Sequence, residues 1–297
     1  MCGLAGIVGE VDLMEQVLLH MSAAQNHRGK ETPNSWVSSF IDARVGLMHN
    51  RMKTIDMAVA PKQPFEDNDT GLVVMLDGEI FNYEDVRRQL ENYYSFTTRG
   101  MCEVITKAYD RWGDGCFDRF EGYFSIVIYN RWSEELLLCR DRFGIKPLFF
   151  ASEIKALFAG GIRPLLSAER WASYLAYSTY GSPYETFWEG VHQLPAGFLL
   201  HYNGYSLVEK RWYEFEKRVS LWSEESPERL PEAFLEQMHR SVGYSLMGEM
   251  EKGLSLNGSL ESALFISLMK EIGLPRSLKS YMHYRGKLHQ SGVLWSA

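Results

Sequence analysis

The first half of the chain contains short apolar runs that end at glycine or at turn-forming residues, and this pattern restricts the fold most strongly. The runs at 123–130 and 135–141 are separated only by the turn-like sequence Arg-Trp-Ser-Glu at 131–134. Apolar runs of this length, with turn residues at both ends, predict β-strands. We expect strands at residues 3–9, 71–78, 123–130 and 135–141.

Segments with apolar residues at helical spacing accompany these runs. Gly113 and the pair Gly160 and Gly161 end two of them, and Ser167 is a suitable N-cap for a third. Together with the strands they predict an α+β domain made of layered sheets and helices. We expect helices at residues 14–25, 104–113, 152–161 and 167–178.

The character of the sequence changes beyond about Gly204. Residues 217–230 are charged and rich in turn residues, which predicts a linker. The remainder has the order helix, strand, turn, helix, strand, and a β-turn-α-β unit predicts two parallel strands. We expect these elements at residues 231–247, 253–256, 257–259, 260–273 and 278–284. The predicted domains are residues 1–205 and a truncated α/β segment at residues 206–297.

Composition excludes several classes of protein. The chain of 297 residues has a net charge of -7, so no basic face for nucleic acid is indicated. Its four cysteines show no CxxC spacing, so neither a disulfide scaffold nor a metal site is predicted. The N-terminus lacks the features of a signal peptide, and no apolar stretch is long enough to span a membrane. We therefore expect a cytoplasmic protein with no nucleic-acid or membrane partner.

Cys2 follows the initiator methionine directly. If Met1 is removed, Cys2 carries both a thiol and a free α-amine, and the amine can serve as the base that activates the thiol. This is the arrangement of an N-terminal nucleophile. The alternative is that Cys2 merely precedes a buried first strand, and the nine residues at the N-terminus do not decide between the two.

Longer segments carry a family resemblance. The segments NHRGKETPNSW, LMHNRMKTID, LDGEIFNYEDVRRQL, CEVITKAYDRWGDGCFDRFEGYFSIVIYN and RDRFGIKPLFFASEIKAL occur in the order seen in class II glutamine amidotransferases. The chain most resembles the glutamine-hydrolysing asparagine synthetase family. The resemblance implies a four-layer αββα sandwich of the N-terminal-nucleophile hydrolase type, followed by a segment like an ATP pyrophosphatase. It also implies an enzyme that hydrolyses glutamine to glutamate and ammonia, with no cofactor.

The resemblance assigns roles to individual residues of the glutaminase site. Cys2 takes the place of the nucleophile, and Arg51 that of the arginine that grips the α-carboxylate of glutamine, for which a guanidinium fork is well suited. The backbone N–H of Gly78 takes the place of an oxyanion-hole donor. The remaining substrate-binding positions are Met52, Thr54, Glu79 and Met101.

Two positions depart from the family pattern. The family has asparagine where this chain has Asp77, and an ionised carboxylate accepts hydrogen bonds but cannot donate one to an oxyanion. The family has aspartate where this chain has Met101, and a thioether cannot hold the α-ammonium of glutamine. On the sequence alone, restoring Asn at 77 and Asp at 101 is expected to raise glutamine hydrolysis about a hundredfold.

The loop that binds pyrophosphate in the synthetase half of the family is altered as well. The family sequence is Ser-Gly-Gly-x-Asp-Ser, and the matching stretch here is Asn-Gly-Ser-Leu-Glu-Ser. This stretch is more typical of a turn followed by a helix cap. We expect neither ATP nor Mg²⁺ to bind this chain alone. The residues of this loop remnant are Asn257, Gly258, Ser259, Glu261 and Ser262.

Several interpretations of function remain open at this point. The leading one is an active glutaminase that works with a separate synthetase chain or as a homodimer. A second is a silent relative that serves as a binding or scaffold subunit, or that belongs to a system like the β-lactam synthetases or lasso-peptide cyclases. A third is a hydrolase that acts on a different amide.

Overall fold

The chain folds into two compact units, Met1–Trp222 and Ser223–Ala297. The computed structural model describes residues 2–38, 45–52, 62–179, 182–222, 226–247, 252–273 and 278–282. The domain boundary predicted at residue 205 falls inside a hairpin, because strands β8 (Phe198–Tyr202) and β9 (Leu207–Arg211) are hydrogen-bonded neighbours. The first unit therefore extends further, to Trp222.

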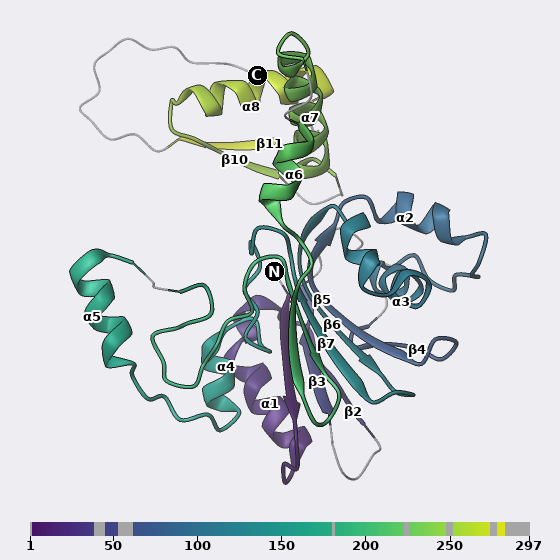
Figure 1. The fold of residues 1–297 in the computed structure, drawn as a ribbon, viewed down its shortest axis with the longest axis vertical. Coiled ribbons are helices and arrows are strands. Elements are labelled where there is room, and N and C mark those ends of the chain that lie inside the picture. The colour runs from purple at the N-terminus through teal and green to yellow at the C-terminus, as the bar shows by residue number, and fades with distance from the viewer. Residues whose placement is uncertain are drawn as a thin grey trace. The chain divides into compact units, whose positions relative to one another are not determined.

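The first unit contains two antiparallel sheets (Figure 1). One has the order β1-β3-β2 and the other the order β4-β5-β6-β7-β8-β9. The other strands are β1 (Gly3–Val8), β2 (Asn34–Val37), β3 (Val45–Asn50), β4 (Phe65–Asp67), β5 (Leu72–Ile80), β6 (Gly122–Asn130) and β7 (Glu135–Arg140). The predicted strands at 3–9, 71–78, 123–130 and 135–141 are thus confirmed as β1, β5, β6 and β7.

Helices cover the outer faces of both sheets. Figure 1 shows α1 and α4 on one side of the two sheets and α2 and α3 on the other. Their bounds are α1 (Met14–Ala24), α2 (Tyr83–Leu90), α3 (Met101–Trp112) and α4 (Ile154–Ala159). Short 3₁₀ turns follow α1 and α3, at η1 (Asn26–Arg28) and η2 (Gly113–Arg119).

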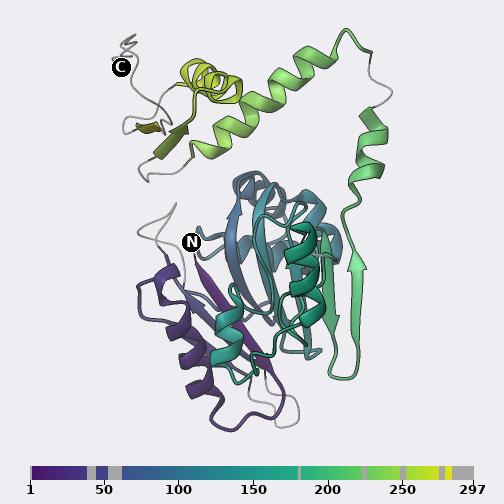
Figure 2. The ribbon, with the colours of Figure 1, turned by 90° about the vertical axis from the view of Figure 1, so that its left-hand side faces the viewer.

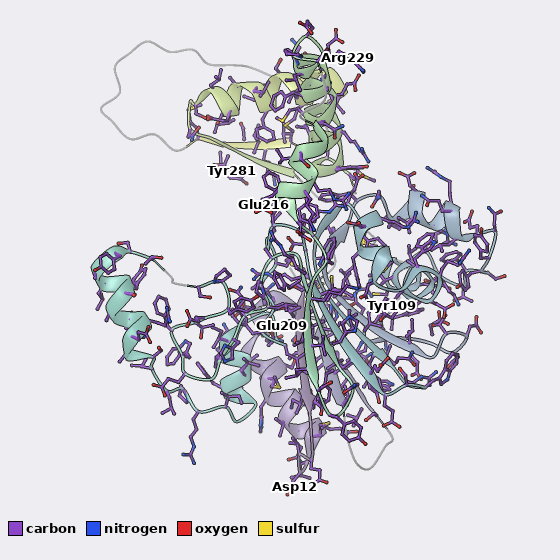
Figure 3. The ribbon with its side chains drawn as sticks, viewed as in Figure 1. Asp12, Tyr109, Glu209, Glu216, Arg229 and Tyr281 are labelled. Atoms are coloured by element: carbon purple, nitrogen blue, oxygen red, sulfur yellow. The ribbon has the colours of Figure 1, made fainter. Side chains whose placement is uncertain are left out.

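Three apolar clusters fill the spaces between these layers. Alternate residues of β5 point to opposite faces, as strand geometry requires. Val73 and Met75 pack between the sheets, whereas Val74 and Leu76 pack beneath α2 and α3. Tyr109 of α3 packs against this second cluster (Figure 3), and Leu18 of α1 belongs to a third. The layers are helix, sheet, sheet and helix, so the predicted αββα sandwich is confirmed.

Two elements of this unit lie at its edge. Helix α5 (Ala168–Tyr177) has no buried residue and lies apart from the sheets (Figure 1). Its predicted cap is present, since the Ser167 hydroxyl accepts a hydrogen bond from the backbone N–H of Arg170 at 3.5 Å. Strand β9 ends the larger sheet, and its residues, Glu209 among them, are exposed (Figure 3).

The second unit contains the predicted β-turn-α-β arrangement (Figure 2). Strands β10 (Lys252–Leu256) and β11 (Leu278–Met282) pair in parallel around α8 (Leu260–Ile272). Val242 of α7 (Leu230–Ser245) packs with Leu268 and Met269 of α8. The linker predicted at residues 217–230 is partly wrong, because helix α6 (Phe215–Trp222) includes its first residues. No helix in the described parts of the chain is long and apolar enough to cross a membrane.

Candidate functional site

Cys2 lies immediately before β1, at the end of the smaller sheet. The antiparallel register pairs Gly3 with Asn50 and so brings Cys2 next to Arg51. The Cys2 thiol lies 3.8 Å from the carbonyl oxygen of Met52. Three of the predicted site residues, Cys2, Arg51 and Met52, are therefore brought together. Thr54 lies outside the described residues.

Asp77 lies on β5 and its side chain is completely buried. Its carboxylate accepts three hydrogen bonds, from Arg28 Nη2 at 2.7 Å, Ser152 Oγ at 2.8 Å and Lys146 Nζ at 2.9 Å. A buried carboxylate is stable only when charged partners and donors satisfy it, and these three do so. The side chain that departs from the family pattern is thus an anchored acceptor.

The same network reaches the nucleophile. Arg28 lies in η1, and its Nε donates to the carbonyl oxygen of Cys2 at 2.8 Å while its Nη2 bonds to Asp77. Ser152 also holds the start of β1, because its hydroxyl accepts from the backbone N–H of Leu4 at 3.1 Å. The carboxylate at 77 and the backbone of Cys2 are therefore parts of one hydrogen-bonded group.

These charges act on the thiol. Burial raises the pKa of Cys2, and the negative charge of Asp77 raises it further, whereas the positive charge of Lys146 lowers it. The thiol is therefore largely protonated at neutral pH. Removal of its proton then requires a nearby base, which the α-amine of Cys2 becomes when Met1 is removed.

Arg28, Lys146 and Ser152 are site residues that the sequence analysis missed. The signal for them is Asp77 itself, since an acid that directly follows the apolar run Leu-Val-Val-Met-Leu in the same predicted strand indicates a buried carboxylate that needs cations. The sequence does not say which of its cations supply them.

Gly78 follows Asp77 at a very close approach between β5 and β6. Its φ is +143°, and a Cβ at this position would lie 2.1 Å from the carbonyl oxygen of Tyr123. Only glycine fits here. Glu79 is the next residue, and it is partly buried. Burial raises the pKa of Tyr123, and the negative charge of Glu79 raises it further.

Met101 is the first residue of α3 and packs, partly buried, against the apolar cluster beneath that helix. The loop before it is held by Glu103, whose carboxylate accepts from the backbone N–H groups of Thr97 and Thr98 at 2.7 and 2.6 Å and from both hydroxyls. Burial raises the pKa of Cys102, and the nearby Cys2 adds to that shift. The first position of α3 therefore carries an apolar side chain that packs into the core, where the family has a carboxylate.

A cavity of about 560 Å³ lies next to Arg51. Arg51 Nε is 3.8 Å from the carboxylate of Glu31. Burial lowers the pKa of His49 to about 4, so this histidine is neutral at pH 7. The lining residues are Lys30, Glu31, Thr32, Pro33, Asn34, His49, Arg51, Lys62 and Gln63.

The loop at 257–262 satisfies its own polar groups. Asn257 Oδ1 accepts from the backbone N–H of Ser259 at 3.1 Å and from the hydroxyl of Ser262 at 2.8 Å. Ser259 caps α8 by accepting from the N–H of Ser262 at 3.3 Å. Gly258 has φ +77°, and Glu261 is exposed in the first turn of α8. The structure is a turn followed by a helix cap, as this stretch of sequence favours.

Among the residues that the structure describes, no cluster of three or more His, Cys, Asp or Glu side chains could hold a metal ion.

Comparison with known proteins gives a consistent picture. Residues 1–213 match the family model described as "Glutamine amidotransferase domain". The asparagine synthetase [glutamine-hydrolyzing] 2 of Bacillus subtilis (strain 168) is 33% identical over 295 residues, which cover 89% of this chain and 38% of that protein. The amidase chry2 of Gibberella zeae is 27% identical, over 83% of this chain and 37% of that protein. The chain thus spans under two fifths of the length of these two relatives.

Solved structures show the same fold at low sequence identity. Glutamine phosphoribosylpyrophosphate amidotransferase of B. subtilis, solved with ADP and GMP, has a TM-score of 0.51 at 16% identity, covering 71% of this chain and 49% of that one. A structure of an allosteric regulatory enzyme of purine biosynthesis has a TM-score of 0.52 at 14% identity, covering 99% and 68% of the two chains. At such identities the likeness concerns the fold alone.

Proposed function

This chain belongs to the glutamine amidotransferase domain family, and on that basis we propose that it hydrolyses the side-chain amide of glutamine with Cys2 as the nucleophile. The observation that carries the proposal is the position of Cys2. Its thiol lies beside Arg51 and Met52, and the Arg28 and Asp77 network holds its backbone. A guanidinium next to the nucleophile is suited to bind the carboxylate of an amino-acid substrate.

The reaction has two covalent steps. With Met1 removed, the α-amine of Cys2 takes the thiol proton, and the sulfur attacks the carboxamide carbon to form a C–S bond. The C–N bond then breaks, and the amine returns the proton to the departing nitrogen, which leaves as ammonia. Water attacks the thioester, the C–S bond breaks, and glutamate and the free thiol are released.

The charge distribution at Asp77 bears on the oxyanion that forms in both steps. Two buried cations, Arg28 and Lys146, bond to the buried carboxylate of Asp77, and Arg28 also bonds to Glu153, so the negative charge at 77 is compensated. Preorganised positive charge stabilises a developing oxyanion. In this proposal Lys146 takes the place of the asparagine amide that the family uses, and it acts beside the backbone N–H of Gly78.

A diazoketone analogue of glutamine tests this assignment. The reagent is expected to alkylate Cys2 once per chain, and excess glutamine is expected to protect the thiol. Cys2→Ser should remain unlabelled, and Cys102, buried and with a raised pKa, should not react. Labelling elsewhere, or labelling that glutamine does not slow, would argue against a glutamine site at Cys2.

For the rest of the chain we propose a supporting role without nucleotide chemistry. The relatives named as asparagine synthetases suggest that the ammonia is used by a synthetase, either a separate chain or a second copy. The polar groups of the loop at 257–262 bond to one another, which favours a structural turn over a site for ATP and Mg²⁺. We expect no ATP–pyrophosphate exchange with this chain alone. We also propose that the protein is cytoplasmic.

A further inference from the structure

Arg28 uses all three nitrogens of its guanidinium to join three parts of the fold. Its Nε donates to the carbonyl oxygen of Cys2 at 2.8 Å, its Nη2 to Asp77 at 2.7 Å and its Nη1 to Glu153 at 3.2 Å. A guanidinium is planar and rigid, so two fixed nitrogens determine where the third one points. The carboxylates of Asp77 and Glu153 therefore direct Nε at Cys2.

The carbonyl of Cys2 is the backbone group through which this contact holds the nucleophile. Once Met1 is removed, Cys2 is joined to the chain by a single peptide bond, and it carries both the thiol and the amine of the proposed reaction. A displacement of about 1 Å at a reacting group can lower a rate about a hundredfold. The direction of the hydrogen bond from Arg28 therefore bears on the rate of attack.

Glu153 has a fixed place relative to the first strand. Residues 150–152 run antiparallel beside β1, and the backbone N–H of Ser152 donates to the carbonyl oxygen of Leu4 at 2.9 Å. Glu153 follows this segment directly and occupies the N-cap position of α4. Its carboxylate is therefore placed by backbone that is hydrogen-bonded to β1, the strand that Cys2 precedes.

The carboxylate of Glu153 is ionised at neutral pH. Burial by itself would raise its pKa, but hydrogen bonds from Lys155, His27 and Arg28 lower it overall. Arg28 and His27 bond to Oε1, whereas Lys155 Nζ lies 2.9 Å from Oε2. Lys155 therefore offers a matched control, because its loss leaves the contact between Oε1 and Arg28 in place.

We propose that Glu153 is a positioning residue for the nucleophile, which acts by holding Arg28 against the carbonyl of Cys2. The inference rests on the proposed function, since the step being positioned is the attack of Cys2 on the amide of glutamine. Glu153→Ala should lower kcat about tenfold to a hundredfold and leave KM nearly unchanged, because it alters the geometry of attack and not substrate binding. Glu153→Gln keeps an oxygen acceptor and should lie between the two, and Lys155→Ala should stay within about twofold of the parent.

The test measures kcat and KM for ammonia release from glutamine with the full chain. Rates are expressed per Cys2 that the diazoketone analogue labels, so that misfolded protein is not counted. Glu153→Ala is also made in an Arg28→Met background, which lacks the fork. Since Glu153 acts through Arg28, the second substitution should then cost little further activity.

Hydrogen exchange in the peptide of residues 2–8 gives a readout that does not depend on turnover. We expect at least about threefold faster exchange there in Glu153→Ala than in Lys155→Ala, because the Cys2 carbonyl is held less firmly.

The outcomes separate this inference from the proposed function. If the parent releases ammonia and Glu153→Ala matches its kcat, or if the loss is as large in the Arg28→Met background, Glu153 does not position Cys2 and the glutaminase assignment stands. If the parent releases no ammonia, the proposed function fails, and unchanged exchange at residues 2–8 overturns the positioning contact as well. Should Glu153→Ala fold poorly, a kcat for Glu153→Gln equal to that of Lys155→Ala overturns the inference.

Discussion

Asp77→Asn is the substitution whose outcome depends most on the structure. The parent carboxylate is fully buried and holds Lys146 Nζ at 2.9 Å, and the Lys146 side chain is only 6% exposed. At an effective dielectric constant of 20 the attraction of this pair is about 6 kcal/mol before desolvation is subtracted. Removing one member of a buried pair costs about 3–5 kcal/mol, because the other charge is left without its partner.

Arg28 is less affected by this substitution than Lys146. Arg28 keeps its hydrogen bonds to Glu153 and to the Cys2 carbonyl, whereas Lys146 has no second carboxylate among the residues described. We therefore expect Asp77→Asn to lower the free energy of unfolding by about 3–5 kcal/mol and to bring less than a tenfold gain in glutamine hydrolysis. Adding Lys146→Met removes the orphaned charge and should restore most of the lost stability.

The assay is urea unfolding followed by hydrogen exchange in peptides of β5 and β6. A local probe is needed because the chain has two compact units, and a global signal would mix their transitions. The control is Lys146→Met alone, which completes the double-mutant cycle. If Asp77→Asn is as stable as the parent, or if the double variant is no more stable than Asp77→Asn, the charge network does not anchor this site.

Three further predictions follow from the site and its surroundings. Intact mass should show that Met1 is absent from the purified protein, and a retained Met1 would rule out the α-amine of Cys2 as the base. Lys146→Met should slow the alkylation of Cys2 by iodoacetamide at pH 8, because the lysine charge lowers the pKa of Cys2. The difference in rate between the parent and the variant should shrink at higher pH, and identical rates at pH 8 would refute this prediction. Hydrogen bonds from His201 and Lys210 lower the pKa of Asp114 to about 2, so Asp114→Asn should cost about 1–2 kcal/mol at pH 7. Because the folded pKa is depressed, that cost should disappear as the pH falls from about 4 to about 2, and a cost independent of pH would contradict the ion-pair explanation.

Local sequence pattern was sufficient to predict the central strands. The run ending at Gly78 and the pair of runs around 131–134 became β5, β6 and β7, because apolar strands between turn residues are a short-range signal. Helix α3 begins at Met101, three residues before the predicted start. The sequence did not indicate this start, because the N-cap residue is Gly100, which has no polar side chain. Hairpin β8–β9 was not predicted, since β9 is exposed and lacks an apolar run.

The residues that matter most for the chemistry could not be predicted in the same way. Arg28, Lys146 and Ser152 lie 49, 69 and 75 positions from Asp77 along the chain and meet it only in the folded protein. The family resemblance located Cys2, Arg51 and Gly78, and it identified position 77 as unusual. It did not indicate that the acid is held by two cations, and this changes the expected effect of restoring the asparagine.

The central claim is that Cys2 hydrolyses a carboxamide, and its most direct test is product formation by the full chain. Purified protein is incubated with a saturating concentration of glutamine, and both ammonia and glutamate are quantified, beside Cys2→Ala as the matched control. Our account predicts equal amounts of ammonia and glutamate from the parent protein, and none above background from Cys2→Ala. Equal rates from the parent and Cys2→Ala, or no product from the parent, would contradict it.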